Sequence, residues 1–306
     1  MYPAGATGDK EQQATPRTTQ MIAQTHSIDP ILALRFTRRK ESWVAAASGR
    51  FYKITRKSDD PLRDLVDPAC IGTSLREYTN VCFLHGLDEA VCHPESIDRA
   101  CIVYPLLSGP DLRTLLISRA SGEQREAALR SAMRLLGRLH HGNTDGHPVK
   151  DYRRDGFLAP STAVLERMAR RPRTLVVTGF EARNFRFDRR RDAWFFFDPH
   201  HVWSGHPEED FARFMISLLM IRGRRRGPRL WTGFDRFRLR EAYERHAPAK
   251  LDDTLLNYFL REELAMRRFH ATRLARRTPA VARAFVTAYT RLYYHRLQRA
   301  LVVQRF

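Results

Sequence analysis

The chain has 306 residues, of which 43% are hydrophobic and 28% charged, so it is long enough for one large two-lobed domain or two domains and is not of disordered composition. Its formal net charge of +19 comes from 53 Lys and Arg against 34 Asp and Glu, and it implies attraction to an anionic partner. Nucleic acid, an anionic membrane surface and a phosphorylated or acidic substrate fit this charge equally well, and so do solvated arginine-rich faces with no dedicated partner.

The N-terminal segment and the cysteines bear on where the protein resides. Residues 1–25 are rich in Gly, Thr, Gln and Ala and lack the regions of a signal peptide, so we expect a flexible leader. The longest near-apolar run, Phe211–Ile221, contains Arg213 and is shorter than the roughly 20 residues that cross a bilayer. The cysteines form no CxxC pair, which favours reduced thiols; they are Cys70, Cys82, Cys92 and Cys101. We expect a cytoplasmic protein, with peripheral membrane binding as the alternative.

The first hundred residues predict a small β-rich unit. Trp43–Arg56 alternates around a Ser48-Gly49 turn, which predicts a β-hairpin. After a polar connection, Thr73–Leu87 places its apolar residues on one stripe and predicts an amphipathic helix. Ala100–Leu107 (ACIVYPLL) reads as a buried strand.

The rest of the chain is predicted to be mostly helical. Ser108-Gly109-Pro110 ends the buried strand, and Asp111 can cap a short helix through Ile117. The segment Val176–His201 contains two short apolar runs around a charged turn, which predicts two strands. Apolar residues at three- and four-residue spacing predict helices over Glu123–His141, Ala163–Arg170, Phe211–Ile221, Arg236–Arg245, Thr254–Arg276 and Pro279–Val303.

Five polar residues stand out along this order of elements. Lys53 lies on the second strand of the hairpin, in GRFYKIT, and Glu77 lies on the following helix, in SLREYTN. Asn184 precedes the charged turn, and Asp198 ends the apolar run WFFFD, where a carboxylate needs a partner such as a cation. Asp210 follows in GHPEEDFARF. Amide and carboxylate oxygens at such positions suit Mg²⁺.

These residues and their order resemble the protein-kinase-like fold, in particular its aminoglycoside phosphotransferase and lipopolysaccharide kinase branch. The resemblance covers about residues 40–220. It implies an α+β fold of two lobes: a leader over residues 1–25, a small β-rich N-lobe over 26–108, and a larger helical C-lobe over 109–306 that carries the catalytic loop and the metal-site hairpin. It further implies ATP and Mg²⁺ as cofactors.

The resemblance also implies a nucleotide site between the lobes. Lys53 would hold the nucleotide phosphates, and Glu77 would be its ion partner. Tyr104 and Leu106, on either side of a proline, would form the hinge that meets the adenine edge. In the alternative reading, Lys53 and Glu77 are ordinary surface residues, the neighbouring Lys57 takes the role of the lysine, and the hinge is a core strand ending in a turn.

The metal ligands that the resemblance implies are Asn184 and Asp198, which have close to the family's spacing. The alternative for Asp198 is a turn residue at a strand end. Asp210 matches the Asp of the family's GDPxxDLA stretch, which braces the catalytic loop, and it is also a possible helix N-cap. The phosphate loop is poor in glycine: the candidate hairpin end, Ala45–Gly49, has one.

The catalytic loop departs from the family pattern. Where the family has His-Gly-Asp, this chain has Val177-Thr178-Gly179, so the residue that orients the acceptor hydroxyl lacks a side chain. Glu181, two residues further along, is the candidate replacement, with an ion pair to Arg183 as its structural alternative. Other carboxylates precede the loop and could reach it, namely Asp145, Asp151 and Asp155.

Three functions follow from these observations. The first is an ATP- and Mg²⁺-dependent phosphotransferase acting on a hydroxyl of a sugar, a saccharide-lipid or another small anionic acceptor. The second is a pseudokinase that serves as a regulatory or binding module, which the altered loop favours. The third is a basic nucleic-acid-binding protein, which rests on charge alone.

Overall fold

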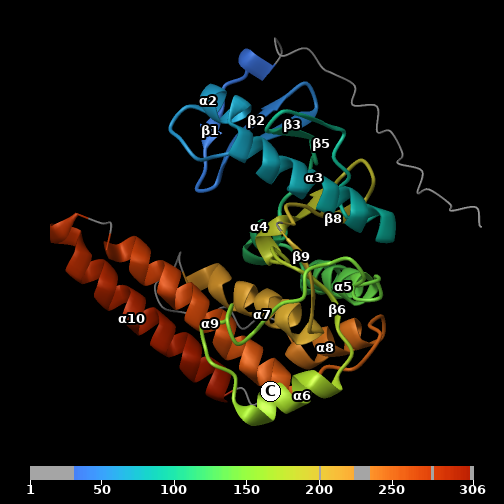
Figure 1. Ribbon diagram of the computed structural model, residues 1–306, viewed down its shortest axis with the longest axis vertical. Coiled ribbons are helices and arrows are strands. Elements are labelled where there is room, and N and C mark those ends of the chain that lie inside the picture. The colour runs from blue at the N-terminus through green and yellow to red at the C-terminus, as the bar shows by residue number, and fades with distance from the viewer. Residues whose placement is uncertain (1–30, 200, 224–234, 277–278, 304–306) are drawn as a thin grey trace, which may run out of the picture.

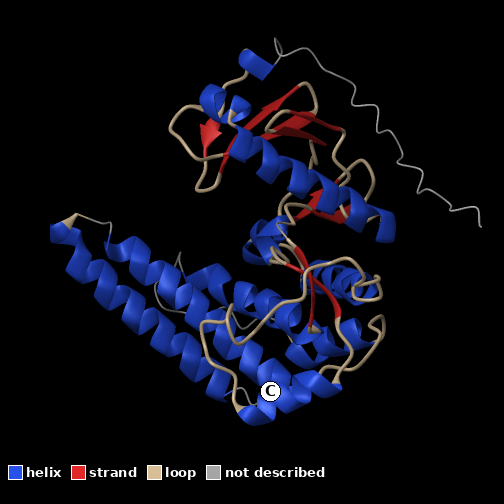
Figure 2. Cartoon of the chain, viewed as in Figure 1, coloured by secondary structure: helices blue, strands red, loops and turns tan. Residues whose placement is uncertain are grey.

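The computed structural model describes residues 31–199, 201–223, 235–276 and 279–303, and the expected leader lies outside these ranges. Within them the chain forms a smaller lobe built on a sheet and a larger, mostly helical lobe (Figure 1, Figure 2). The α+β, two-lobed fold expected from the sequence is therefore confirmed.

The smaller lobe is an antiparallel sheet in which the strand order is β1-β2-β3-β5-β4. The hairpin between β2 and β3 is confirmed; Ser48 and Gly49 have φ of 49° and 75° at its turn, as the right-handed twist of a tight hairpin requires. The strands are β1 (Thr37–Arg38), β2 (Ser42–Ala47), β3 (Arg50–Thr55), β4 (Ser96–Asp98) and β5 (Cys101–Pro105).

Two helices cross this sheet, and both begin at an Asp-Pro pair. Helix α2 (Pro61–Val66) is capped by Asp60, and α3 (Pro68–Leu87) is capped by Asp67. Each aspartate accepts backbone N–H groups of the first turn, and each proline occupies a position that needs no N–H. The helix expected from Thr73 therefore starts at Pro68, and α2 replaces the expected polar connection.

Strand β5 is buried on both faces and joins the two hydrophobic cores. Cys101 and Val103 pack into a cluster of the smaller lobe, whereas Ile102 and Tyr104 pack into a cluster that continues through the larger lobe. Alternate residues of a strand point to opposite faces, so an unbroken apolar run is what a strand covered on both sides requires. The buried strand expected over Ala100–Leu107 is confirmed.

The helices of the larger lobe lie close to their expected positions. The main difference is α7, which begins at Pro207 instead of Phe211, so Asp210 lies inside its first turn and is not its N-cap. The helices are α4 (Leu112–Ile117), α5 (Gly122–Leu139), α6 (Thr162–Arg170), α7 (Pro207–Gly223), α8 (Arg236–Glu244), α9 (Asp253–Arg276) and α10 (Ala280–Val303). Within the described ranges, no helix has the length and apolar character needed to cross a bilayer.

Two small two-stranded sheets carry the segment that follows α6. β6 (Thr174–Val177) pairs with β9 (Val202–Gly205), and β7 (Phe185–Asp188) pairs with β8 (Ala193–Phe196). The two strands expected on either side of the charged turn are β7 and β8. Val176 belongs instead to β6, whose partner β9 lies beyond Asp198 in the chain.

A cluster of phenylalanines holds the loop between β6 and β7 against the larger lobe. The ring of Phe180 lies 4.9 Å from that of Phe185, 5.0 Å from that of Phe196 and 5.6 Å from that of Phe214, measured between centroids. All four side chains are buried. The backbone from Val177 to Phe185 is therefore held in place by the packing of these aromatic side chains.

Candidate functional site

The structure brings Lys53, Glu77 and Asp198 together where the two lobes meet. The Lys53 ammonium on β3 donates to Oε1 and Oε2 of Glu77 on α3, at 2.7 and 2.8 Å, and to Oδ1 of Asp198, just after β8. Only 11% of the Lys53 side chain is exposed. The cluster therefore joins the sheet of the smaller lobe to the hairpin of the larger one.

The charges of this cluster support one another. Burial disfavours a charged Lys53, but Asp198 and Glu77 outweigh it and raise the pKa of the ammonium above its ordinary value. The hydroxyl of buried Tyr104 donates to Oε1 of Glu77 at 3.1 Å, and burial followed by the Glu77 charge keeps the pKa of that hydroxyl well above its ordinary value. The buried Tyr104 hydroxyl thus helps to orient the Glu77 carboxylate.

Asp198 has φ of 65°, in the left-handed region that side chains other than Asn and Asp rarely adopt. A residue held in this region costs on the order of 1 kcal/mol or more and persists where its surroundings enforce it. Such strain concentrates at functional sites, and here it coincides with the ion pair to Lys53.

Asn184 lies beside Asp198 because their strands are paired. The N–H of Phe197 donates to the carbonyl of Asn184 at 2.9 Å, and the Asn184 side-chain amide donates to the carbonyl of Gly179 at 2.8 Å. The second bond uses an N–H of the amide, so the amide oxygen is the atom of this side chain that suits a cation. One carboxylate and one amide oxygen fit a Mg²⁺ ion whose other ligands are phosphate oxygens and water.

Asn184 and Asp198 are two candidate ligands, and Mg²⁺ in proteins commonly takes one or two protein ligands together with phosphate oxygens and waters. Among the described residues, no group of three or more His, Cys, Asp and Glu side chains is placed to hold an ion. The pair of Asn184 and Asp198 therefore suits an ion that arrives with a phosphate ligand.

The loop that departs from the family pattern has its own backbone geometry. Gly179 has φ of 100°, which an L side chain adopts only with strain. The hydroxyl of Thr178 donates to the carbonyl of His201 at 3.1 Å and accepts the N–H of His201 at 2.7 Å. The segment Val177-Thr178-Gly179 is therefore a turn fixed by hydrogen bonds to His201, and the carbonyl of its last residue accepts the side-chain amide of Asn184.

Glu181 is held by arginines on both oxygens. Arg267 donates to Oε1 at 2.9 Å, and Arg183 approaches Oε2 at 2.8 Å. Burial raises the pKa of Glu181, but the two arginines outweigh it and hold the pKa below its ordinary value. These contacts match the structural alternative, in which Glu181 pairs with Arg183, and they make it a weak proton acceptor.

The three other carboxylates lie in the polar loop before α6. Asp145 forms a surface turn with Asn143, whose side-chain amide donates to it at 3.1 Å. Asp151 follows Lys150, whose N–H donates to the Ser204 carbonyl, beside the Thr174 end of β6. Asp155 closes the turn that begins at Asp151. Gly179 follows the opposite end of β6, so Asp151 and Asp155 lie about a strand length away from it.

Asp210 holds the start of the loop between β6 and β7 through a hydrogen bond from the backbone of Val177. Its Oδ2 accepts the N–H of Val177 at 2.6 Å, and its Oδ1 pairs with Arg213 at 2.8 Å, with the side chain fully buried. His140 lies 3.4 Å from Oδ2. Sequence reasoning did not assign a role to Arg213 or His140, although a lone arginine inside the apolar run Phe211–Ile221 was a signal of a buried ion pair.

The backbone N–H of the expected hinge already has a hydrogen-bond partner within the protein. The N–H of Leu106 donates to the Gly49 carbonyl at 2.9 Å, and Pro105 has no N–H. The turn at Gly49 therefore lies beside the hinge, about four residues of strand away from Lys53. Ala45–Gly49 does not form the phosphate loop, because it lies at the hinge end of β3. An adenine contact at the N–H of Leu106 requires this bond to open.

Solved structures share the fold of this protein. A candidate aminoglycoside phosphotransferase from Ralstonia eutropha JMP134 is 16% identical, with a TM-score of 0.59 over 87% of this chain and 92% of that chain. The ADP-bound aminoglycoside phosphotransferase APH(2'')-Ib is 13% identical, with a TM-score of 0.53 over 88% and 96% of the two chains. The choline kinase LicA from Streptococcus pneumoniae is 10% identical, with a TM-score of 0.51 over 90% and 94%.

No family model and no curated protein matches the sequence. The structural comparisons show that the protein has the protein-kinase-like fold, in the form seen in aminoglycoside phosphotransferases, as the sequence resemblance predicted.

Replacing Gly179 by Ala is expected to lower the free energy of unfolding by about 1–2 kcal/mol, because a Cβ is strained at this positive φ. Gly179→Asp, which places the family's residue at this position, is expected to lose at least as much. Gly72→Ala is the matched control: Gly72 is helical, its added Cβ meets nothing within 4 Å, and the change should stabilise by about 0.5–1 kcal/mol. Urea denaturation measures all three. A Gly179→Ala protein as stable as the wild type would contradict the strained turn.

Glu181→Gln is expected to lower the free energy of unfolding by about 2 kcal/mol near pH 7, because the charged bonds to Arg267 and Arg183 are lost. The native state depresses the pKa of Glu181, so its contribution is present above the ordinary value of 4.5 and is lost as pH falls through the lower folded pKa. The difference between the two proteins should therefore shrink below pH 4.5 in urea titrations. A difference that stays constant with pH would show that the carboxylate charge is not what stabilises.

Proposed function

We propose that the protein binds ATP with Mg²⁺ between its two lobes and transfers a phosphoryl group to a hydroxyl of a small molecule. The observation that carries this proposal is the contact of the Lys53 ammonium with both Glu77 and Asp198, where the residue before Asp198, Phe197, is bonded to the backbone carbonyl of Asn184. A lysine held between two carboxylates at a lobe boundary is suited to a polyphosphate accompanied by a divalent ion.

Each residue of the cluster has a role in this proposal. Lys53 donates to the nucleotide phosphates, and Glu77, itself held by Tyr104, keeps the ammonium in place. Asp198 and Asn184 hold the metal through their oxygens. The ion, when bound, neutralises negative charge on the phosphates. The strained backbone of Asp198 positions its carboxylate before any ligand arrives.

The structural neighbours support the nucleotide and a hydroxyl of a small molecule as the acceptor. They are named as aminoglycoside phosphotransferases, one of them with ADP bound, and as a choline kinase. The net charge of +19 favours an acceptor that carries negative charge, such as an acidic saccharide. An anionic membrane surface and nucleic acid remain expectations that rest on charge alone.

The proposed transfer proceeds without a side-chain base at the loop. Gly179 has no carboxylate, and both oxygens of Glu181 are paired with arginines. General-base assistance contributes about 10²–10⁴-fold in many enzymes, while positioning and electrostatic stabilisation supply most of phosphoryl transfer. We therefore propose a slow phosphotransferase.

The missing loop carboxylate also favours a second candidate function. A kinase-fold protein with glycine at position 179, and with Glu181 paired to two arginines, can serve as a binding module that responds to nucleotide. In this case the Lys53 cluster binds ATP, and no phosphoryl group leaves the nucleotide.

Nucleotide binding is the first measurement. Isothermal titration with ATP and Mg²⁺ should show saturable binding. Asp198→Asn should weaken it at least tenfold, which is about 1.4 kcal/mol, because the variant removes the negative charge of the proposed metal ligand and the ion pair of that ligand with Lys53. Glu123→Gln, a change of equal charge on the exposed start of α5, should bind like the wild type. Equal affinity in Asp198→Asn and the wild type would remove the proposed site, and with it both candidate functions.

Phosphoryl transfer separates the two candidates. Labelled ATP offered to a panel of aminoglycosides, sugars, choline and acidic saccharides should give a product at roughly 10²–10⁴-fold below the 1–100 s⁻¹ of typical kinases. Lys53→Met should abolish the product, whereas Lys57→Met, an exposed lysine four residues on, should leave it unchanged. Nucleotide binding without any product on the panel would support the binding module. Loss of product in Lys57→Met alone would show that the wrong lysine was assigned.

A further inference from the structure

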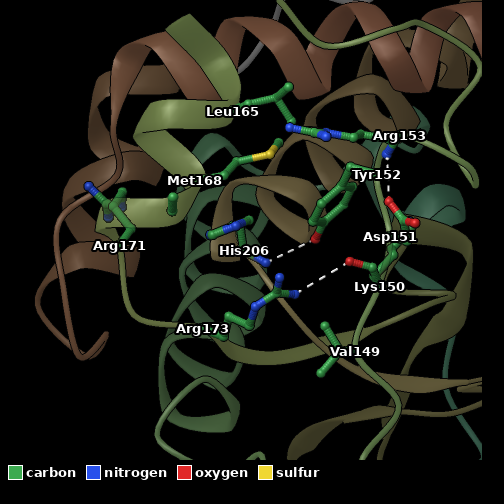
Figure 3. Close-up of a pocket in the computed structure, with 11 residues that line it drawn as sticks. Val149, Lys150, Asp151, Tyr152, Arg153, Leu165, Met168, Arg171, Arg173 and His206 are labelled. Atoms are coloured by element: carbon green, nitrogen blue, oxygen red, sulfur yellow. Dashed lines mark hydrogen bonds between the residues drawn. The ribbon is translucent and has the colours of Figure 1, made fainter. Parts of the chain in front are cut away.

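A cavity of about 450 Å³ lies in the larger lobe, away from the Lys53 cluster (Figure 3). Its walls come from the segment 149–153, from α6, from residues 171–173 before β6, and from His206 before α7. Arg173 adjoins the Thr174 end of β6, whereas Gly179 follows the Val177 end. At about 3.3 Å per residue, this places the cavity roughly 15–20 Å from the loop.

The cavity wall has a surplus of positive charge. Four cations line it, Lys150, Arg153, Arg171 and Arg173, against the single carboxylate of Asp151. Lys150 and Arg171 are paired with buried acids behind the wall.

The two other arginines of the wall are not neutralised. Arg173 donates to two backbone carbonyls, at 3.2 and 3.4 Å, and within the described part of the chain neither it nor Arg153 has an acidic partner. Two guanidinium groups that line one cavity without an ion pair to a carboxylate favour an anionic occupant.

His206 adds an independent observation. Its side chain has no exposed surface, lines the cavity, and neither ring nitrogen has a hydrogen-bond partner among the described residues. Leaving a buried N–H without an acceptor costs free energy on the order of 1–3 kcal/mol. Burial, followed by the charges of Arg173 and Arg171, lowers the pKa of His206 to about 4, so the ring is neutral and donates through one nitrogen.

The part of the cavity formed by α6 is different in character. Leu165, Met168 and Ala169 of α6 line it with apolar surface (Figure 3). A cavity of this volume is larger than one phosphate ion and accommodates an attached organic group. The charged wall and the apolar wall together describe an anionic head on a small organic body.

We propose that this cavity binds a phosphate group carried by a small molecule, with Arg173, Arg153 and His206 as donors. Arginine forks and an imidazole N–H supply more donors than one carboxylate accepts, which favours the three oxygens of a phosphate. Because the cavity lies about a strand length from the loop, its occupant is distinct from the nucleotide phosphates proposed to bind at Lys53. The inference does not depend on the proposed function.

The test is calorimetric titration of the full chain with inorganic phosphate and, separately, with glycerol phosphate, at constant ionic strength. Saturable binding is expected, and Arg173→Gln and Arg153→Gln should each weaken it at least tenfold. Arg170→Gln is the matched control, because Arg170 is a neighbouring arginine with a side chain 79% exposed and paired with Glu166 outside the cavity. It should bind like the wild type. Arg153→Gln keeps the test valid if Arg173→Gln fails to fold.

The outcomes separate this site from the nucleotide site. Tighter binding of glycerol phosphate identifies an organic ligand, and equal binding identifies free phosphate; both support a phosphate site. Binding that persists in Arg173→Gln and Arg153→Gln but is lost in Lys53→Met would place the phosphate beside Lys53 and overturn the proposal. Absence of saturation, or equal weakening of phosphate binding in Arg170→Gln, would show that the binding reflects only the net positive charge of the protein. Either result would also overturn the proposal.

Discussion

The arrangement of the molecule depends on placing one ammonium, that of Lys53, in a poorly solvated position. An isolated charge there is costly, so it requires carboxylates, and the chain supplies Glu77 from the smaller lobe and Asp198 from the larger one. Removing one partner of such a buried pair typically costs about 3–5 kcal/mol. The two lobes are thus held together by an electrostatic contact at the position where a charged ligand would enter between them.

A second set of buried charges supports the larger lobe. Arg213 pairs with Glu209 and Asp210, and Glu209 also pairs with Lys150. Asp210 then accepts the N–H of Val177. Aromatic packing fixes the loop at Phe180, and the hydrogen bond to Asp210 fixes it at Val177. The loop conformation is therefore determined by its surroundings, although its own sequence differs from that of the family.

Local signals allowed most elements to be predicted, whereas the pairing of Lys53 with Glu77 was implied by the family resemblance and the contact of Lys53 with Asp198 was not expected. Periodic apolar residues located the long helices, and an apolar strand ending in Asp198 indicated a partner for that charge. The Asp-Pro pairs at Asp60 and Asp67 were an available signal for helix starts that sequence reasoning passed over. The pairing of Glu181 with Arg267, 86 residues away, and the engagement of Leu106 by Gly49 depend on tertiary contacts, which no local pattern encodes.

The positive φ of Gly179 has a consequence for how this loop can change over generations. A carboxylate side chain at this position is strained at the φ of 100°, and a backbone rotation that relieves the strain also displaces the carbonyl that holds Asn184. A substitution that adds a side chain at Gly179 therefore also disturbs the orientation of the Asn184 amide, so the two positions are coupled through the backbone of the loop.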